Sequence, residues 1–376
     1  MIVFILTFFS LYGLLHLYAF LKLKIYLNPG LLWEISIALF MVLMIFVPLI
    51  VRIAEKHGLE KTAIILSWIG YLWMALIALF FFFSIFIDLL RFLIFIFNQM
   101  AGTKFSLFPL AKLYFFIPFF ISILMLVYGY FEALNIKTEH IEIRTNKVKR
   151  DVRIVQISDL HIGLIIRESR VKKVTQKIRE INPDIVVSTG DLVDGQINSI
   201  TKIVEILKEL QPPFGKFAVT GNHEFYAGLK QALVFTEQAG FQILRQEGIY
   251  IDELGINIIG VDDFEVKRYD STKILSEEEV FEKFRKPGFT ILLKHRPFVN
   301  DKTRQFFDLQ LSGHTHKGQF FPFSIVTALY YTKDSGCIED TNGCHLYISK
   351  GTGTWGPPIR IFAPPEITVI DIKRLD

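Results

Sequence analysis

The chain has 376 residues, 51% of them hydrophobic, with 41 Lys and Arg against 37 Asp and Glu. Its mean hydropathy of +0.39 is high for a soluble protein. The apolar and aromatic content excludes a disordered chain, and two cysteines are too few for a disulfide scaffold.

The apolar residues are concentrated in the first third of the chain. Residues 1–135 hold 8 Lys and Arg, 5 Asp and Glu, and 21 of the 37 Phe. Residues 136–376 hold 33 basic and 32 acidic residues, and this small net charge argues against a nucleic-acid partner. The sequence therefore predicts a transmembrane region over 1–135 and a globular domain over 136–376.

Four apolar runs in the first region are long enough for the hydrocarbon core of a bilayer, which takes about 20 helical residues. His16 is the single ionisable residue inside these runs, and we expect it to be a structural hydrogen-bonding group. No Lys or Arg precedes the first run, which disfavours a cleaved signal peptide. The region is interpreted as an anchor of about four helices. Its runs are Ile2–Leu21, Ile35–Val51 with an extension back to Leu31, Thr62–Ile87 with Phe92–Phe97 as an interfacial continuation, and Leu113–Phe131.

Two observations point to opposite sides of the membrane for the globular domain. Nine basic residues lie in the loops on its side and five in the opposite loops, which favours the cytoplasm. Cys337 and Cys344 flank a turn-like segment, Asp340–Gly343, and on a hairpin they would lie opposite each other, near enough to bridge. A bridge would indicate an oxidising, exoplasmic side, whereas two reduced cysteines would not.

From about residue 136 the pattern alternates between short strand-like runs and helical spacing. Strand-like runs end in polar residues, and stretches with helical spacing follow the first three of them. This alternation predicts an α/β fold whose polar strand ends converge at one edge. The strand-like runs are Arg153–Ser158, Asp184–Ser188, Lys216–Thr220, Ile256–Val261, Thr290–Lys294 and Asp308–Leu311, and the helical stretches are Glu168–Ile181, Ile197–Leu210 and Leu229–Ala239.

Metal-ligand side chains gather just past these runs. Side chains two residues apart on an extended segment share a face, so each Asp-x-His or His-x-His pair can serve one site. Carboxylate, imidazole and amide ligands suit Mn²⁺, Fe or Zn²⁺ better than Ca²⁺. About seven ligands with one shared carboxylate fit two metals about 3.5–4 Å apart, an arrangement that serves phosphoester displacement. The residues are Asp159, His161, Asp191, Asn222, His223, His295, His314 and His316.

These motifs resemble the calcineurin-like metallophosphoesterase superfamily. DLH at 159–161, GDLVD at 190–194, GNHE at 221–224, KHRP around His295 and GHTH at 313–316 follow the family order. The apolar N-terminal region and the closing segment Gly351–Ile367 look like the bacterial integral-membrane subgroup. The resemblance implies a four-layer α/β sandwich, in which two mixed sheets pack face to face between helices.

The resemblance also implies a role for each motif residue. His223 would be catalytic, stabilising the transition state or protonating the leaving oxygen, and Asp194 would orient His223 or a ligand. Two divalent metal ions are implied, with Asp191 bridging them. The first metal would be held by Asp159, His161, Asp191 and His316, and the second by Asp191, Asn222, His295 and His314.

The implied activity is metal-dependent hydrolysis of a phosphodiester, phosphomonoester or pyrophosphate bond by a hydroxide that bridges the metals. A membrane tether raises the local concentration near lipids, so a lipid-linked substrate at a bacterial cell membrane is expected. Trp355, Phe362, Phe320 and Phe321 would line a groove for an acyl chain or belong to the core. A soluble nucleotide substrate is the alternative, and a non-catalytic metal-binding sensor or scaffold is a third hypothesis. The oligomeric state stays open.

Overall fold

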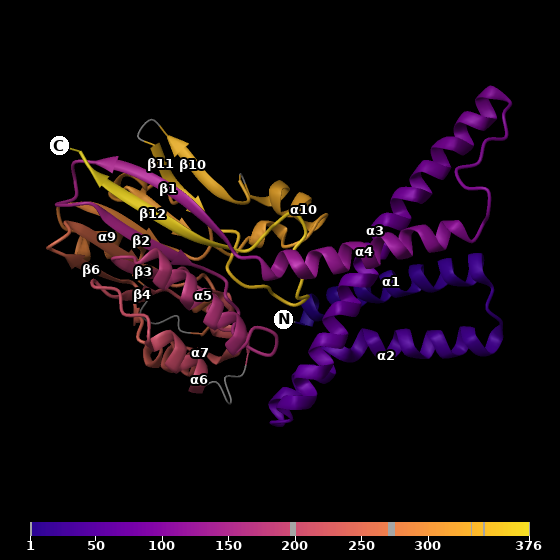
Figure 1. Ribbon diagram of the computed structural model, residues 1–376, viewed down its shortest axis with the longest axis horizontal. Helices are drawn as coiled ribbons and strands as arrows, with labels where there is room; N and C mark the ends of the chain where they lie inside the picture. The colour runs from indigo at the N-terminus through magenta and orange to yellow at the C-terminus, as the bar shows by residue number, and fades with distance from the viewer. Residues whose placement is uncertain (1, 196–200, 270–274, 332, 341–342, 376) are drawn as a thin grey trace. The chain divides into compact units, whose positions relative to one another are not determined.

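The computed structural model describes residues 2–195, 201–269, 275–331, 333–340 and 343–375. Contacts divide the chain into two compact units (Figure 1). One comprises Met1–Phe131 with Gly356–Ile359, and the other comprises Glu132–Trp355 with Arg360–Asp376. The predicted domain limits at 1–135 and 136–376 stay a prediction.

The first unit contains four long apolar helices: α1 (Ile2–Leu27), α2 (Leu31–Lys56), α3 (Glu60–Ala101) and α4 (Leu113–Leu134). All four are long and apolar enough to cross a membrane. They pack around a small core drawn from each helix, with α3 oblique to the others (Figure 1). The core residues are Ala19, Met41, Ile77, Phe80 and Phe115.

These helices run past the apolar segments of the sequence and take in charged residues. Phe92–Phe97 is a regular part of α3, which has 42 residues. His16 accepts a hydrogen bond from Trp73 Nε1 and donates from Nδ1 to Tyr12 O, both at 2.8 Å. The expectation that His16 is the single ionisable group within the spans is too narrow, because buried Lys22 of α1 pairs with Asp88 of α3. That ion pair compensates the two charges in apolar surroundings.

The second unit contains two six-stranded mixed sheets among the described residues, and the predicted α/β sandwich is confirmed. The first sheet has the order β1-β12-β2-β3-β4-β5, and the second has the order β10-β11-β9-β8-β7-β6. In the first sheet β2, β3, β4 and β5 are parallel, and in the second β7, β8, β9 and β11 are parallel. The strands are β1 (Lys137–Thr145), β2 (Val152–Ile157), β3 (Ile185–Ser188), β4 (Lys216–Ala218), β5 (Gln242–Ile243), β6 (Glu247–Ile251), β7 (Ile256–Gly260), β8 (Phe289–Leu293), β9 (Leu309–Ser312), β10 (Gly336–Asp340), β11 (Gly343–Ile348) and β12 (Glu366–Arg374).

The first sheet packs against an apolar layer on each of its two faces. Its inner face packs on the second sheet through side chains such as Ile154, Val187, Ile258 and Leu293. Its outer face packs on helices through a second cluster that includes Val171 and Phe235. A third cluster covers the outer face of the second sheet with α9. The helices of this unit are α5 (Glu168–Ile181), α6 (Thr201–Lys208), α7 (Asn222–Gln238), α8 (Val266–Tyr269), α9 (Glu277–Phe284) and α10 (Phe323–Tyr330), with 3₁₀ turns η1 (Arg304–Phe306) and η2 (His316–Gly318).

Helix α7 has two parts, because Gly228, at φ 103°, breaks its helical backbone. The part after Gly228 is the helix predicted at about Leu229–Ala239, and a first part that begins at Asn222 was not predicted. The early start is stabilised because the Glu224 carboxylate accepts the Gly221 N–H at 2.6 Å, which satisfies a donor that the first turn leaves free. Residues 197–200 of the helix predicted at 197–210 lie outside the described residues, and α6 begins at Thr201.

The predicted hairpin near the cysteines forms from β10 and β11, but its register differs from the expectation. Cys337 pairs with Tyr347 and Cys344 with Glu339, so the two cysteines are not directly opposite. The register also shifts between Ile338 and Glu339 on β10. Cys337 is disulfide-bonded.

Candidate metal centre

The parallel strands of both sheets deliver the predicted residues to one place. Each candidate follows the carboxyl end of a strand, because parallel strands present these ends at the same edge. All nine predicted residues come together through the contacts described below. Asp159 and His161 follow β2, Asp191 and Asp194 follow β3, Asn222 and His223 open α7 after β4, His295 follows β8, and His314 and His316 follow β9.

Five of these residues have a left-handed backbone, which non-glycine residues rarely adopt. Such conformations cost about 1–3 kcal/mol each and persist where the surroundings enforce them, often at functional sites. Here the turn lets a side chain face the strand edge directly after the strand ends. The φ angles are 52° at Asp159, 53° at His161, 52° at Asp191, 72° at His314 and 50° at His316.

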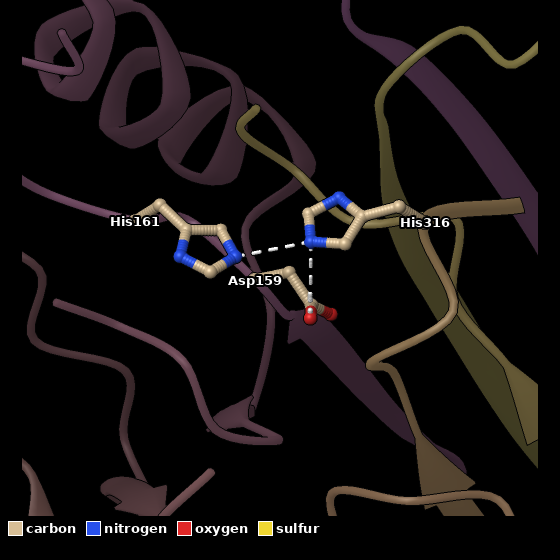
Figure 2. A group of neighbouring side chains, drawn as sticks. All are labelled: Asp159, His161 and His316. Atoms are coloured by element: carbon tan, nitrogen blue, oxygen red, sulfur yellow. Dashed lines mark hydrogen bonds and ion pairs between the residues drawn. The ribbon is translucent and has the colours of Figure 1, made fainter. Parts of the chain in front are cut away.

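Asp159, His161 and His316 form the first group of candidate ligands (Figure 2). The Nε2 atoms of the two histidines lie 3.0 Å apart, and His316 Nε2 lies 3.5 Å from Asp159 Oδ1. All three side chains are buried. Burial lowers the pKa of His161 to about 4, so this imidazole is neutral and one of its ring nitrogens has a lone pair available to a cation.

Asp191, His295 and His314 form the second group. His295 Nε2 lies 3.2 Å from Asp191 Oδ2, 3.1 Å from His314 Nδ1 and 3.2 Å from Asn222 Oδ1. The ligand atoms of Asp191, His314 and Asn222 therefore all lie close to His295 Nε2. His295 Nδ1 lies 2.8 Å from the carbonyl of Thr189 and must donate to it, so Nε2 is the ring atom that would bind a metal after giving up its proton.

Asp191 connects the two groups through one oxygen. Its Oδ2 lies 3.2 Å from His295 Nε2 and 3.9 Å from His161 Nε2. Although burial opposes ionisation, the imidazoles of His295 and His223 hold the pKa of Asp191 well below its usual value. Burial likewise opposes a charge on His295, but Asp191 raises the pKa of that imidazole to about 10. A buried carboxylate that needs a positive neighbour fits a bridging role between two cations.

The His316 ring is held from its other side by Arg360. The Arg360 guanidinium is fully buried and donates to His316 Nδ1 at 3.0 Å and to the His316 carbonyl at 3.0 Å. Burial, followed by the Arg360 charge, lowers the pKa of His316 well below its usual value. Since arginine only donates, Nδ1 of the neutral ring accepts and Nε2 carries the proton. A metal at Nε2 would have to displace that proton.

His223 lies beside these groups and contacts an acid. Its Nδ1 lies 2.7 Å from Asp194 Oδ1, and its ring packs edge-on against His161 with centroids 4.6 Å apart. Although burial opposes protonation, Asp191 and Asp194 raise the pKa of His223 to about 9. A protonated imidazole with a free Nε2 can donate to an oxygen.

Two further side chains, those of Glu224 and Ser158, position the candidate ligands, and the sequence did not predict this role for them. The Glu224 carboxylate accepts the N–H groups of Asp191 at 3.0 Å and Leu192 at 2.7 Å, besides that of Gly221. The Ser158 hydroxyl donates to Asp159 Oδ2 at 2.5 Å. Glu224 is the last residue of the GNHE motif, and an acid in the first turn of a helix was the available signal.

The sequence of this chain is similar to those of known proteins. Residues 152–318 match the family model of the calcineurin-like phosphoesterases. An uncharacterized metallophosphoesterase of Aquifex aeolicus is 39% identical over 257 residues, which is 68% of this chain and 98% of the relative. An uncharacterized metallophosphoesterase of Bacillus subtilis is 32% identical over 65% of this chain and 90% of the relative.

Other relatives carry additional sequence. A transmembrane protein with metallophosphoesterase domain from Danio rerio is 30% identical over 269 residues. The matched region is 68% of this chain and 61% of that protein's length. Among solved structures, a 5'-nucleotidase precursor from Thermus thermophilus is 11% identical, with a TM-score of 0.36 over 59% of this chain and 54% of that one. That likeness is too distant to bear on activity. By its sequence relatives, the chain belongs to the calcineurin-like metallophosphoesterase family.

Proposed function

We propose that this chain is a membrane-anchored phosphoester hydrolase with two divalent metal ions. The observation that carries the proposal is the position of Asp191 Oδ2 between the imidazoles of His161 and His295. One shared carboxylate with imidazoles on both sides suits a pair of Mn²⁺, Fe or Zn²⁺ ions. Asp159, His161, Asp191 and His316 would hold one ion, and Asp191, Asn222, His295 and His314 the other.

When bound, the two cations would activate water and neutralise charge on the phosphoryl oxygens. The protein's own residues supply the remaining functions. Asp194 accepts from His223 Nδ1 and fixes the ring, so that Nε2 can donate to the leaving oxygen. Glu224 holds the backbone around Asp191 in place through its N–H contacts. Burial of the ligand side chains excludes bulk water and strengthens these charge interactions.

The proposed substrate carries its phosphodiester, phosphomonoester or pyrophosphate bond on a lipid-linked molecule. Four helices suited to a bilayer support this, because a tethered site meets lipid head groups at high local concentration. Detergent-solubilised phospholipid should then be hydrolysed faster than a soluble dinucleotide at equal concentration. The reverse preference would favour a soluble nucleotide substrate with α1–α4 as an anchor alone.

The test of hydrolysis uses purified full-length protein with Mn²⁺ and bis(p-nitrophenyl) phosphate. Asp191→Asn should abolish turnover because it weakens both proposed metal positions. Asp371→Asn is the matched control, since Asp371 is a carboxylate of β12 that pairs with Arg153 at 2.7 Å. Equal turnover by Asp191→Asn and the wild type at equal metal content would refute the proposal. Bound metal without turnover on any phosphoester would favour a sensor or scaffold.

We place the protein in a bacterial cell membrane as a multi-pass protein with its catalytic unit in the cytoplasm. The excess of basic residues in the loops on that side supports this orientation. The disulfide at Cys337 favours the opposite side, where oxidising conditions maintain such bonds. Labelling of intact cells with an impermeant maleimide after reduction separates the two. Cysteines that react before the membrane is permeabilised would reverse the orientation.

A further inference from the structure

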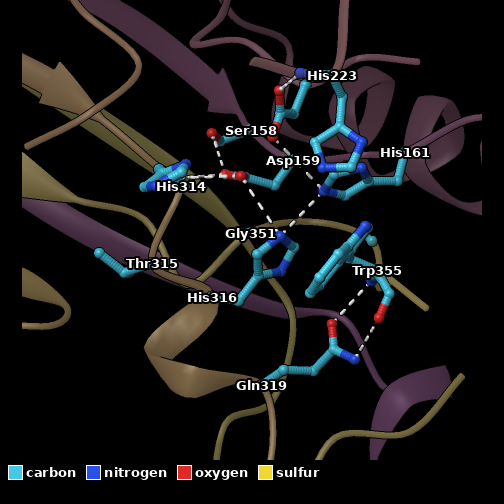
Figure 3. A network of polar contacts seen from close by, with 12 residues as sticks. Ser158, Asp159, His161, His223, His314, Thr315, His316, Gln319, Gly351 and Trp355 are labelled. Carbon is cyan, nitrogen blue, oxygen red and sulfur yellow. Dashed lines mark hydrogen bonds and ion pairs between the residues drawn. The ribbon is translucent and has the colours of Figure 1, made fainter. Parts of the chain in front are cut away.

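One buried amide fixes the backbone of a tryptophan beside the candidate metal centre (Figure 3). Gln319 Nε2 donates to the Trp355 carbonyl at 2.7 Å, and the Trp355 N–H donates to Gln319 Oε1 at 2.8 Å. Gln319 is only 6% exposed. Because both backbone groups of Trp355 engage the same side chain, the main chain at this position has little freedom to rotate.

The segment that carries Gln319 begins at a candidate metal ligand. His316, Lys317, Gly318 and Gln319 have φ angles of 50°, 51°, 69° and 60° in succession. Non-glycine residues hold such angles only where their surroundings enforce them. Arg360 adds a second connection, since it donates to the His316 carbonyl at 3.0 Å and to the Gly353 carbonyl at 3.1 Å. The placement of Trp355 is therefore tied to that of His316.

The Trp355 ring is half-exposed and lies against His223. Its centroid is 5.8 Å from that of His223, with the rings 73° apart. The ring of Tyr226, also half-exposed, has its centroid 5.5 Å from that of His223. His223 is thus bordered by two aromatic rings that keep large surfaces open to solvent. Phe320, which was predicted to line an acyl groove or to belong to the core, is buried and belongs to the core.

The chemistry of His223 determines what these rings would meet. Nδ1 of His223 is engaged by Asp194, so Nε2 is the atom that would donate to a leaving oxygen. Whatever group is attached to that oxygen must then lie next to the His223 ring, where Trp355 is fixed. A large exposed indole in that position offers flat apolar surface.

We propose that Trp355 is a substrate-binding residue that packs against an apolar group on the leaving oxygen, and that Gln319 is its positioning residue. The inference builds on the proposed hydrolysis and narrows its substrates to phosphoesters whose leaving alcohol bears an aryl ring or an alkyl chain. Both groups present the same apolar surface to the indole. Inorganic phosphate lacks it and would bind independently of Trp355.

The test measures KM, kcat and competitive inhibition for the metal-loaded full chain. In Trp355→Ala, KM for bis(p-nitrophenyl) phosphate should rise about tenfold, as expected for loss of one aromatic contact with its buried surface. Inhibition by phenylphosphonate or decylphosphonate should weaken by a similar factor, while inhibition by inorganic phosphate stays unchanged. The phosphonate whose inhibition weakens more in Trp355→Ala identifies the group as aryl or alkyl. Trp355→Phe should restore most of the affinity, and Trp33→Ala, at an exposed indole of α2, should match the wild type.

Gln319 is tested through its coupling to Trp355. Gln319→Leu should raise KM like Trp355→Ala at unchanged metal content, and the double variant should be no worse than Trp355→Ala alone. Trp355 is the only tryptophan outside the first unit, since Trp33, Trp68 and Trp73 lie in α2 and α3. Phenylphosphonate should therefore change the fluorescence of the wild type and change it less in Gln319→Leu.

The inference is overturned if an active Trp355→Ala variant keeps wild-type KM and phosphonate inhibition. It is also overturned if the effects of the two substitutions add, because Gln319 would then act independently of Trp355. Failure of the proposed hydrolysis gives a different result, namely no turnover by the metal-loaded wild type on any phosphoester.

Discussion

His223 Nδ1 lies 2.7 Å from Asp194 Oδ1, so the imidazole shares its proton with a carboxylate. Asp194 and Asp191 together raise the pKa of His223 to about 9, against the opposing effect of burial. Asp194 is therefore placed both to orient the ring and to keep it protonated in the neutral pH range.

Asp194→Asn should lower kcat by about 10- to 100-fold, the usual effect of losing such a positioning partner. Removal of the carboxylate lowers the pKa of His223, so the ring loses its proton at lower pH. The basic limb of the kcat profile should consequently move to lower pH. The measurement is a pH–rate profile for both proteins at equal metal content. An unmoved basic limb would mean that His223 is not the group whose protonation is required.

Substitution of single histidines should separate the two proposed metal positions. His316→Ala removes a ligand atom from the first group and His314→Ala removes one from the second. Each variant should retain about one metal per chain in place of two, and both should lose hydrolysis because the proposed chemistry needs the pair. Elemental analysis after gel filtration measures the number of metal ions bound per chain. Two retained metals in either variant would contradict the ligand assignment.

Gly313→Ala should damage the site although it adds only one methyl group. A Cβ at this position would lie 1.9 Å from Ser158 Oγ and 2.2 Å from Asp159 Oδ2. We expect a loss of about 1–3 kcal/mol in the free energy of unfolding from overpacking, with reduced metal content as Asp159 moves. Thermal unfolding and metal analysis measure both. Gly13→Ala is the control, since its Cβ meets nothing within 4 Å, and a wild-type metal content in Gly313→Ala would be the contrary result.

The ion pair between Lys22 and Asp88 should stabilise the helical unit. Lys22 Nζ lies 2.5 Å from Asp88 Oδ1, and Tyr18 donates to the other carboxylate oxygen at 2.7 Å. Asp88→Leu leaves a buried ammonium unpaired and should cost about 3–5 kcal/mol. Lys22→Met with Asp88→Leu removes both charges and should recover most of that loss. Unfolding in detergent micelles measures the three proteins, and equal destabilisation of the single and double variants would argue against the pair.

Much of the fold followed from local patterns in the sequence. The apolar runs predicted four long helices, and the runs before Asp159, Asp191 and His295 predicted β2, β3 and β8. The strand predictions succeed because burial on both faces of a parallel strand forces a continuous apolar run. The sequence predicted the part of α7 after Gly228 but not its first turn, where the Glu224 carboxylate accepts the Gly221 N–H.

The sequence by itself determined the residue types of the site, their order and the family, because these depend on motifs that are contiguous in the chain. The tertiary structure alone decided which oxygen of Asp191 faces both histidine groups, that Arg360 holds His316, and that Gln319 presents Trp355 to His223. His316 and Arg360, for example, are 44 positions apart in the sequence, and Gln319 and Trp355 are 36 apart. They depend on strand register, left-handed turns and packing between two sheets, and no local pattern of apolar and polar residues encodes those.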